Sequence, residues 1–70
     1  MIKLKVLKLL KEKGRAKYWL WSHMDTSYQN FNNMVENRTK SIQYKNIELF
    51  CNLLECKPND LFEIIDDKMV

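Results

Sequence analysis

The chain has 70 residues, and its 12 lysines and arginines against 9 aspartates and glutamates give a formal net charge of +3 at pH 7. A chain of this length predicts a single small domain over residues 1–70, with little room for an enclosed active site or a cofactor cavity. Its apolar runs are too short for a membrane span. Its two cysteines and single histidine indicate a reduced, cytoplasmic protein rather than a disulfide scaffold.

Charge is unevenly distributed along the chain. Residues 1–17 carry seven bases and one acid, whereas residues 55–70 carry five acids and two bases. A basic half suggests a polyanionic partner, although a solvated lysine face on a helix would give the same composition. Composition by itself favours the solvated face.

The first predicted helix covers residues 5–13, where apolar and charged side chains fall on opposite sides of a helical wheel. Gly14 follows it and is typical of a residue that ends a helix. Residues 2–6 alternate strictly between apolar and basic, so a short extended lead-in is expected before the helix. The chain contains one glycine and one proline, and this scarcity favours helices joined by short turns.

A second helix is predicted over residues 16–23 and a third over residues 27–35, separated by the short turn 24–26. Ser27 is a suitable N-cap for the third helix. The apolar stripe of that helix consists of Phe31, Met34 and Val35. The next residues, 36–42, are polar and basic and predict a loop.

A fourth helix follows this loop, and its apolar positions at helical spacing are Tyr44, Ile47, Phe50, Cys51 and Leu54. Pro58 suits the first position of a fifth helix, where the Asp60 carboxylate meets unpaired backbone N–H groups. The apolar face predicted for the fifth helix consists of Leu61, Phe62, Ile64 and Ile65. The remaining residues, 66–70, are expected to fray.

Five short helices, with a short turn between the second and third, predict a helix-turn-helix domain. The run from Ile42 to Glu63 has the pattern I-x4-I-x2-FC-x2-L-x-C-x-P-x-DLFE. On these residues the chain resembles the small Cro/lambda-repressor-type (XRE-like) transcriptional regulators, whose last two helices carry LC..LGC.P.DL. The resemblance covers about residues 2–65 without a gap, with the helix-turn-helix at about 17–35. It implies an all-α, five-helix lambda-repressor-like fold that binds DNA.

Several positions depart from the family pattern. Lys17 stands where the family usually has Gln, and both side chains can reach a backbone phosphate. Trp21 replaces a small residue, which predicts a wider crossing of the second and third helices or a rotated helix. Asp25 and Asn37 stand at usual glycines, and these residue types tolerate a left-handed backbone. Glu55 also replaces a usual glycine but tolerates that backbone less readily.

The third helix is rich in amide side chains on the side away from its apolar stripe. If it is the recognition helix, its outward arc consists of Tyr28, Gln29, Asn32 and Asn33. Asn and Gln can form paired hydrogen bonds with adenine N6 and N7 in the major groove, so this arc is predicted to read bases. A short exposed helix with neutral polar side chains would show the same pattern, and the family resemblance favours base reading.

Basic and hydroxyl side chains flank the third helix. Phosphate contacts are predicted for Lys17, Ser27, Arg38, Thr39, Lys40, Ser41 and Lys45. Such contacts supply affinity and fix the register of the protein on DNA, but they carry no sequence information. The lysines of the first helix are expected to be solvated, because this helix usually faces away from the groove in the family.

Neither a metal site nor a catalytic site is predicted. Cys51, Cys56 and the distant His23 are too few for a closed zinc site. Cys51 is expected in the core and Cys56 as a partly buried residue after the fourth helix, while His23 suits the surface at a helix C-terminus. A single histidine provides no set of nucleophile, base and orienting group. We therefore expect no enzyme, no cofactor and no small-molecule ligand.

Two other functions fit parts of the sequence. Tyr18, Trp19, Trp21 and Tyr28 are many aromatic residues for this length, and exposed aromatics mark protein interfaces. The protein could then be an antirepressor-like helix-turn-helix module that binds another regulator, and Trp21 covering the outward arc would favour this function. A basic amphipathic peptide on a membrane surface fits only residues 5–13.

We therefore expect a repressor-like, sequence-specific regulator that binds double-stranded DNA and is controlled by occupancy, self-association or a partner. The resemblance implies homodimers on two-fold operators, and one domain of this type reads only a few base pairs. The candidate dimer interface in the C-terminal part of the chain consists of Phe62, Ile65, Met69 and Val70.

Overall fold

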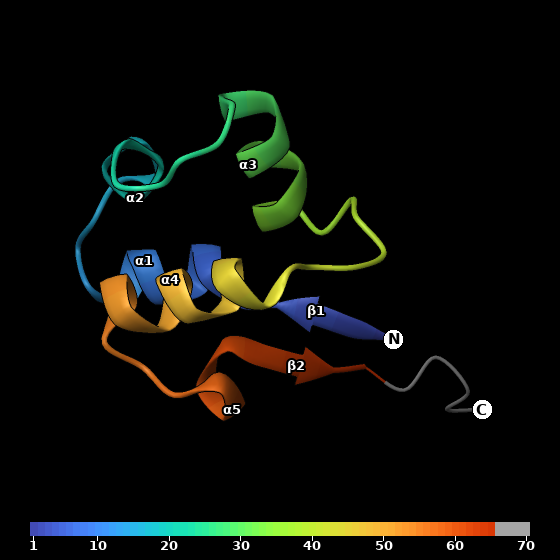
Figure 1. Cartoon of the computed structure of the whole chain (residues 1–70). Coiled ribbons are helices and arrows are strands. Elements are labelled where there is room, and N and C mark those ends of the chain that lie inside the picture. The colour runs from blue at the N-terminus through green and yellow to red at the C-terminus, as the bar shows by residue number, and fades with distance from the viewer. Residues whose placement is uncertain (66–70) are drawn as a thin grey trace.

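The computed structural model describes residues 1–65 and forms five helices and two strands from them. In chain order the elements are β1 (Ile2–Leu4), α1 (Val6–Glu12), α2 (Lys17–Ser22), α3 (Tyr28–Val35), α4 (Tyr44–Leu54), α5 (Pro58–Leu61) and β2 (Phe62–Ile64). α1 and α4 lie side by side, with α2 and α3 on one side of them and the strands with α5 on the other (Figure 1). The expected fraying of residues 66–70 lies outside the described residues.

α1 ends at the glycine that the sequence places after it. Gly14 has a φ of +66°, and the N–H groups of Gly14 and Arg15 donate to the carbonyls of Lys11 and Leu10 at 3.1 and 2.9 Å. These two bonds form a Schellman motif and satisfy carbonyl groups that the helix leaves unpaired. The predicted end of the first helix is therefore confirmed.

α3 is capped at both ends. Ser27 Oγ accepts a hydrogen bond from the Asn30 N–H at 3.2 Å, which confirms the predicted N-cap. At the other end Asn37 is left-handed, with a φ of 63°, and the Arg38 N–H donates to the Asn33 carbonyl at 2.8 Å. The prediction that Asn37 takes the backbone of a glycine is therefore confirmed.

The other two positions where the family has glycine differ from each other. Glu55 ends α4 with a φ of 52° and a ψ of 50°, so it holds the left-handed backbone that its residue type tolerates poorly. Asp25 has no positive φ, so the same expectation is wrong there. The turn instead closes through the Met24 N–H, which donates to the Trp21 carbonyl at 2.9 Å.

The Asn37 side chain joins the end of α3 to the first strand. Its Oδ1 accepts from the Leu4 N–H at 2.7 Å, and its Nδ2 donates to the Leu4 carbonyl at 3.2 Å. A glycine would provide the backbone conformation but neither of these bonds. Asn37 therefore ends the helix and fixes its position against β1.

The fifth helix is shorter than predicted. α5 starts at Pro58 as expected, and the Lys57 N–H donates to the Asp60 carboxylate at 3.3 Å, but the helix ends at Leu61. The next residues form β2, which pairs antiparallel with β1 in a two-stranded sheet. The prediction of a helical apolar face beyond Leu61 is wrong, and the fold is mostly helical rather than strictly all-α.

Strand pairing explains this difference. In the register of the sheet, Ile2 lies opposite Ile64, Lys3 opposite Glu63, and Leu4 opposite Phe62. Successive strand residues face opposite sides, so one side of this β1–β2 ribbon is apolar and the other carries a lysine opposite a glutamate. Extension of α5 would leave the backbone of β1 without these partners. The extended lead-in is confirmed for Ile2–Leu4, although its partner strand was not expected.

Among the described residues, ten buried apolar side chains form the core, and each helix contributes at least one. They are Val6, Leu10, Leu20, Met24, Phe31, Met34, Val35, Phe50, Leu54 and Leu61. Phe31 and Phe50 are the largest that are fully buried, and burial of such a side chain contributes roughly 1.5–3 kcal/mol. Among residues 1–65, no polar or charged residue is buried. The predicted apolar stripe of the third helix is confirmed.

Cys51 and Cys56 are free thiols beside this core, and both are half-buried. Burial raises the pKa of the Cys56 thiol, and the neighbouring Cys51 thiol raises it further. A raised pKa lowers the thiolate fraction at neutral pH, which makes a thiol less reactive. The expected partial burial of Cys56 is confirmed, whereas Cys51, which was expected in the core, is only half-buried at its edge.

Candidate nucleic-acid interface

The helix-turn-helix consists of α2, the following turn and α3. Residues 24–26 lie between the two cap residues, as the sequence predicts. Leu20 on α2, Met24 in the turn and Phe31 on α3 are buried in the same core. Apolar packing therefore fixes the angle between the helices, and the opposite side of α3 faces outward at the top of the molecule (Figure 1).

The outward side of α3 carries the residues that are predicted to read bases. Tyr28 is 44% exposed and Gln29 is exposed, whereas Asn32 and Asn33 are half-buried. Asn32 Oδ1 is shielded from solvent and has no hydrogen-bond partner among residues 1–65. The structure thus brings Tyr28, Gln29 and Asn33 to one polar surface and leaves the Asn32 oxygen covered.

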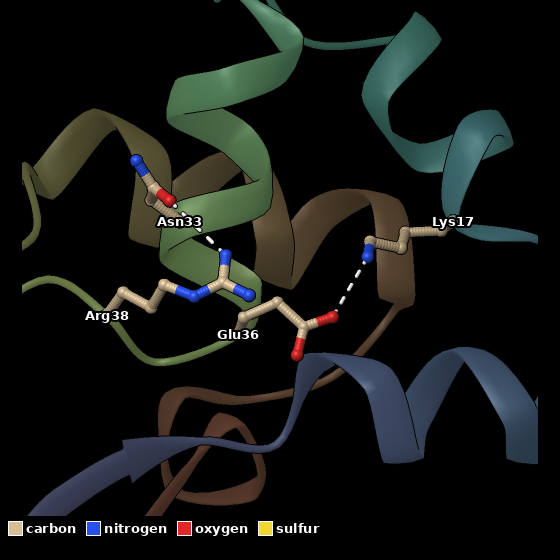
Figure 2. Close-up of polar contacts among 4 residues, drawn as sticks. All are labelled: Lys17, Asn33, Glu36 and Arg38. Carbon is tan, nitrogen blue, oxygen red and sulfur yellow. Dashed lines mark hydrogen bonds and ion pairs between the residues drawn. The ribbon is translucent and has the colours of Figure 1, made fainter.

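Arg38 reaches back to this surface from the loop after α3. Its Nη1 donates to Asn33 Oδ1 at 3.3 Å (Figure 2). This bond occupies the amide oxygen of Asn33 and leaves its NH₂ group as a donor. The next residues of the loop, Thr39, Lys40 and Ser41, are all exposed.

One open hollow between α3 and the start of α4 unites several predicted contact residues. Its lining includes Asn33, Thr39, Ser41 and Lys45. The lining also includes Asn30, Gln43 and Asn46, with Asp25 as its acid. A ligand in this hollow would therefore meet amide and hydroxyl groups together with one lysine and one aspartate.

The chain matches a known protein family. A sequence model of the Cro/C1-type HTH DNA-binding domain matches residues 5–67. The chain belongs to this family. The resemblance inferred from residues 42–63 is thereby confirmed, and double-stranded DNA is the ligand of the domain. No curated protein and no solved structure matches the chain.

In this Cro/C1-type domain, Lys17 is paired within the protein. Its Nζ, at the start of α2, lies 3.0 Å from Glu36 Oε2, at the end of α3 (Figure 2). The hydrogen bond from Lys17, together with its charge, lowers the pKa of Glu36. The sequence pattern predicts a loop at Glu36, which is not among the predicted contact residues. Its spacing of seven residues from Gln29 would have placed it on the outward side of α3.

Trp21 is accommodated by contacts with the turn and the start of α3. Its Nε1 donates to the Thr26 carbonyl at 2.9 Å, and its ring meets Tyr28 edge-on with centroids 5.3 Å apart. The Tyr18 ring packs on its other side, also at 5.3 Å. Trp21 therefore covers only the Tyr28 end of the outward surface and leaves Gln29 exposed.

A second group of side chains surrounds Trp19. The Arg15 guanidinium lies 4.5 Å from the centre of the Trp19 ring, and exposed His23 has its Nδ1 2.8 Å from the Trp19 carbonyl. His23 therefore lies on the surface at the end of α2, as expected.

In the described part of the chain, no group of three or more His, Cys, Asp or Glu residues could hold a metal ion. The helices formed by residues 1–65 are too short or too polar to cross a membrane.

Proposed function

We propose that this domain is a cytoplasmic, repressor-like transcriptional regulator that reads specific DNA sequences with α3. The observation that carries the proposal is the outward amide surface of α3 beside the exposed cations of the following loop. A helix-turn-helix places the N-terminal part of its second helix in the major groove. Amides in that position discriminate bases, whereas cations beside it bind phosphates of any sequence.

Gln29 and Asn33 are the principal base readers in this proposal. They are four residues apart and therefore lie on the same side of α3. Gln29 is exposed and can offer its amide oxygen and nitrogen to an adenine. Asn33 can also pair with an adenine, once the Arg38 guanidinium exchanges its hydrogen bond with Asn33 Oδ1 for one with a phosphate. Tyr28 contacts a base through its exposed edge, and Asn32 does so after rotation of its amide.

Phosphate contacts surround α3 in this proposal. The loop after α3 supplies Arg38, Thr39, Lys40 and Ser41. Lys45 comes from α4 and Lys17 from α2. Ser27 differs from them because its Oγ already accepts from the Asn30 N–H. Its backbone N–H, at the N-terminus of α3, is the proposed phosphate donor.

Dimerisation is proposed through the outer end of the β1–β2 ribbon. Phe62 and Ile65, which the sequence assigns to the interface, are half-buried, and Met69 lies outside the described residues. Ile2 and Ile64 lie directly opposite each other and are 66% and 77% exposed. Contact between two copies would bury both residues and allow two α3 helices to read the halves of a two-fold site.

Selection from a random DNA pool, followed by mobility-shift titration at several salt concentrations, tests the proposal. Gln29→Ala or Asn33→Ala should cost about 1–3 kcal/mol on the selected site, with little effect on random DNA. Lys40→Ala should weaken binding to all sequences about equally and lower the salt slope by roughly one. Asn52→Ala on α4 and Lys11→Ala on α1 are matched controls, because both replaced residues are exposed outside the interface.

Protein binding is the second candidate function. Tyr18 is 66% exposed beside the half-buried Trp21, and their rings continue to Tyr28 at the edge of the outward surface. Such a ring cluster suits a protein partner, as in an antirepressor-like module. If the parent protein shows no salt-dependent binding to any duplex, DNA reading is contradicted. Tyr18→Ala would then be tested for loss of binding to a second regulator.

A further inference from the structure

We propose that Glu36 restrains the DNA affinity of this surface by holding Lys17 away from phosphate. The inference rests on the proposed function, because it concerns the phosphate contact assigned to Lys17. Glu36 would be a residue that lowers affinity, in contrast to the amides and cations around it.

The position of Glu36 places a negative charge among the proposed DNA contacts. It follows Asn33 by three residues and Gln29 by seven, so all three lie on the outward side of α3. Its carboxylate lies 3.0 Å from Lys17 Nζ, and the nearby charge of Arg38 also acts on it. Glu36 therefore lies between two cations that are assigned to phosphates.

The pair is exposed enough for a phosphate to compete for its lysine. The Lys17 and Glu36 side chains are 28% and 34% exposed, and an ion pair with this much solvent contact is weak. A phosphate that draws Lys17 away leaves the Glu36 carboxylate without its partner and close to the DNA backbone. Binding is opposed if the phosphate breaks the ion pair, and it is also opposed if the phosphate and Glu36 share the Lys17 ammonium.

This opposition does not depend on DNA sequence, because both groups act on the backbone rather than on bases. It lowers binding to random DNA, where electrostatic attraction supplies essentially all of the affinity. Stable occupancy of a site then requires the base contacts of α3. Glu36 thus makes the domain depend more on Gln29 and Asn33 than on its positive charge.

Glu36→Gln tests the inference, because it removes the charge and keeps the shape and polarity of the side chain. We expect tighter binding to every duplex by about three- to tenfold at low salt, with a salt slope steeper by about one. In the Lys17→Gln background, Glu36→Gln should raise affinity no higher than that of the parent, because the lysine that it would free is absent. The double variant, in which both side chains of the pair are neutral, should bind about as well as the parent.

A change in net charge alone is controlled by Glu12→Gln. Glu12 is exposed on α1 in a hollow lined by Lys5, Lys8 and Lys13 and by no residue of α2 or α3. A gain over the parent in Glu12→Gln equal to that in Glu36→Gln, or a double variant that binds as tightly as Glu36→Gln, would overturn the inference. Circular dichroism on each variant verifies that the helices are retained.

The two proposals fail in different ways. A parent protein that binds no duplex contradicts DNA reading itself. A parent that binds a selected site, together with a Glu36→Gln variant of unchanged or weaker affinity, contradicts only the role of Glu36. If the Glu36→Gln variant does not fold, Glu36→Ala, which also frees Lys17, takes its place in the same comparisons.

Discussion

The outward side of α3 and the outer end of the β1–β2 ribbon have opposite surface chemistry. On α3 and its surroundings, polar groups are already paired with one another, as in Asn33 with Arg38 and Lys17 with Glu36. At the ribbon end, Ile2 and Ile64 are exposed directly opposite each other. The first surface can exchange its internal hydrogen bonds for those of a charged ligand, whereas the second gains free energy only by leaving water.

This difference separates two responses to salt. Contacts with phosphates weaken as salt rises, because counterions are released on binding, whereas apolar contacts are not screened. Asn37 connects the two regions, since it ends α3 and bonds to Leu4 of β1. Substitutions that affect only one region, or the connection, therefore test whether the division is real.

The largest effect is expected from removing the support of the polar surface. Phe31 is fully buried under α3, so Phe31→Ala should cost about 3–5 kcal/mol of unfolding free energy. That loss is comparable to the whole stability of a domain this small. Urea unfolding followed by circular dichroism measures it. Tyr44→Ala is the control, because Tyr44 is 90% exposed and its loss should change stability by less than about 0.5 kcal/mol. Equal stability of the two variants would contradict the orientation of α3.

The connection between the regions is tested at Asn37. Asn37→Ala removes both hydrogen bonds to Leu4 and puts a residue with poor left-handed propensity at a φ of 63°, so we expect a loss of about 2–3 kcal/mol. Asn37→Gly removes the backbone strain of a non-glycine residue at this φ but also loses both hydrogen bonds to Leu4. It should therefore cost about 1 kcal/mol less than Asn37→Ala. Thermal unfolding of the three proteins measures both values. A glycine variant as stable as the parent would show that the side-chain bonds contribute nothing.

The apolar region is tested by Ile64→Asp. A carboxylate at a position that is 77% exposed in one copy should leave the fold intact but weaken the proposed dimer by at least about tenfold. Sedimentation at several protein and salt concentrations measures association. Tyr44→Asp, on α4, is the matched exposed control. A parent that is monomeric at high concentration, with and without DNA, would rule out this interface.

The smallest effect is expected in the pH dependence of stability, through the Lys17–Glu36 pair of the polar surface. The Lys17 hydrogen bond and charge lower the pKa of Glu36 in the folded protein. The resulting stability is complete above the ordinary pKa of a glutamate and is lost as the pH falls through the lowered value. We therefore expect the urea midpoint of the parent to fall slightly more on acidification than that of Glu36→Gln. Identical pH profiles would show that this exposed pair does not contribute to stability.

Local sequence signals predicted much of the helical frame. Gly14 ends α1, Ser27 caps α3, and Phe31 with Met34 defines the buried side of α3, because each depends on residues within a few positions. The outward location of Gln29 follows from the same spacing. The amides of Asn32 and Asn33 were less predictable, because their burial and bonds depend on neighbours outside the helix.

By itself, the sequence determined the family, the helix-turn-helix and the polar character of α3, because repeating apolar positions and capping residues act over short distances. Only the tertiary structure decided that α5 stops at Leu61, since β2 forms where β1 offers backbone partners from the other end of the chain. It also decided that Lys17 meets Glu36 across 19 residues and that Asn37 meets Leu4 across 33. Such pairings depend on how the helices pack, and no local pattern in the chain encodes them.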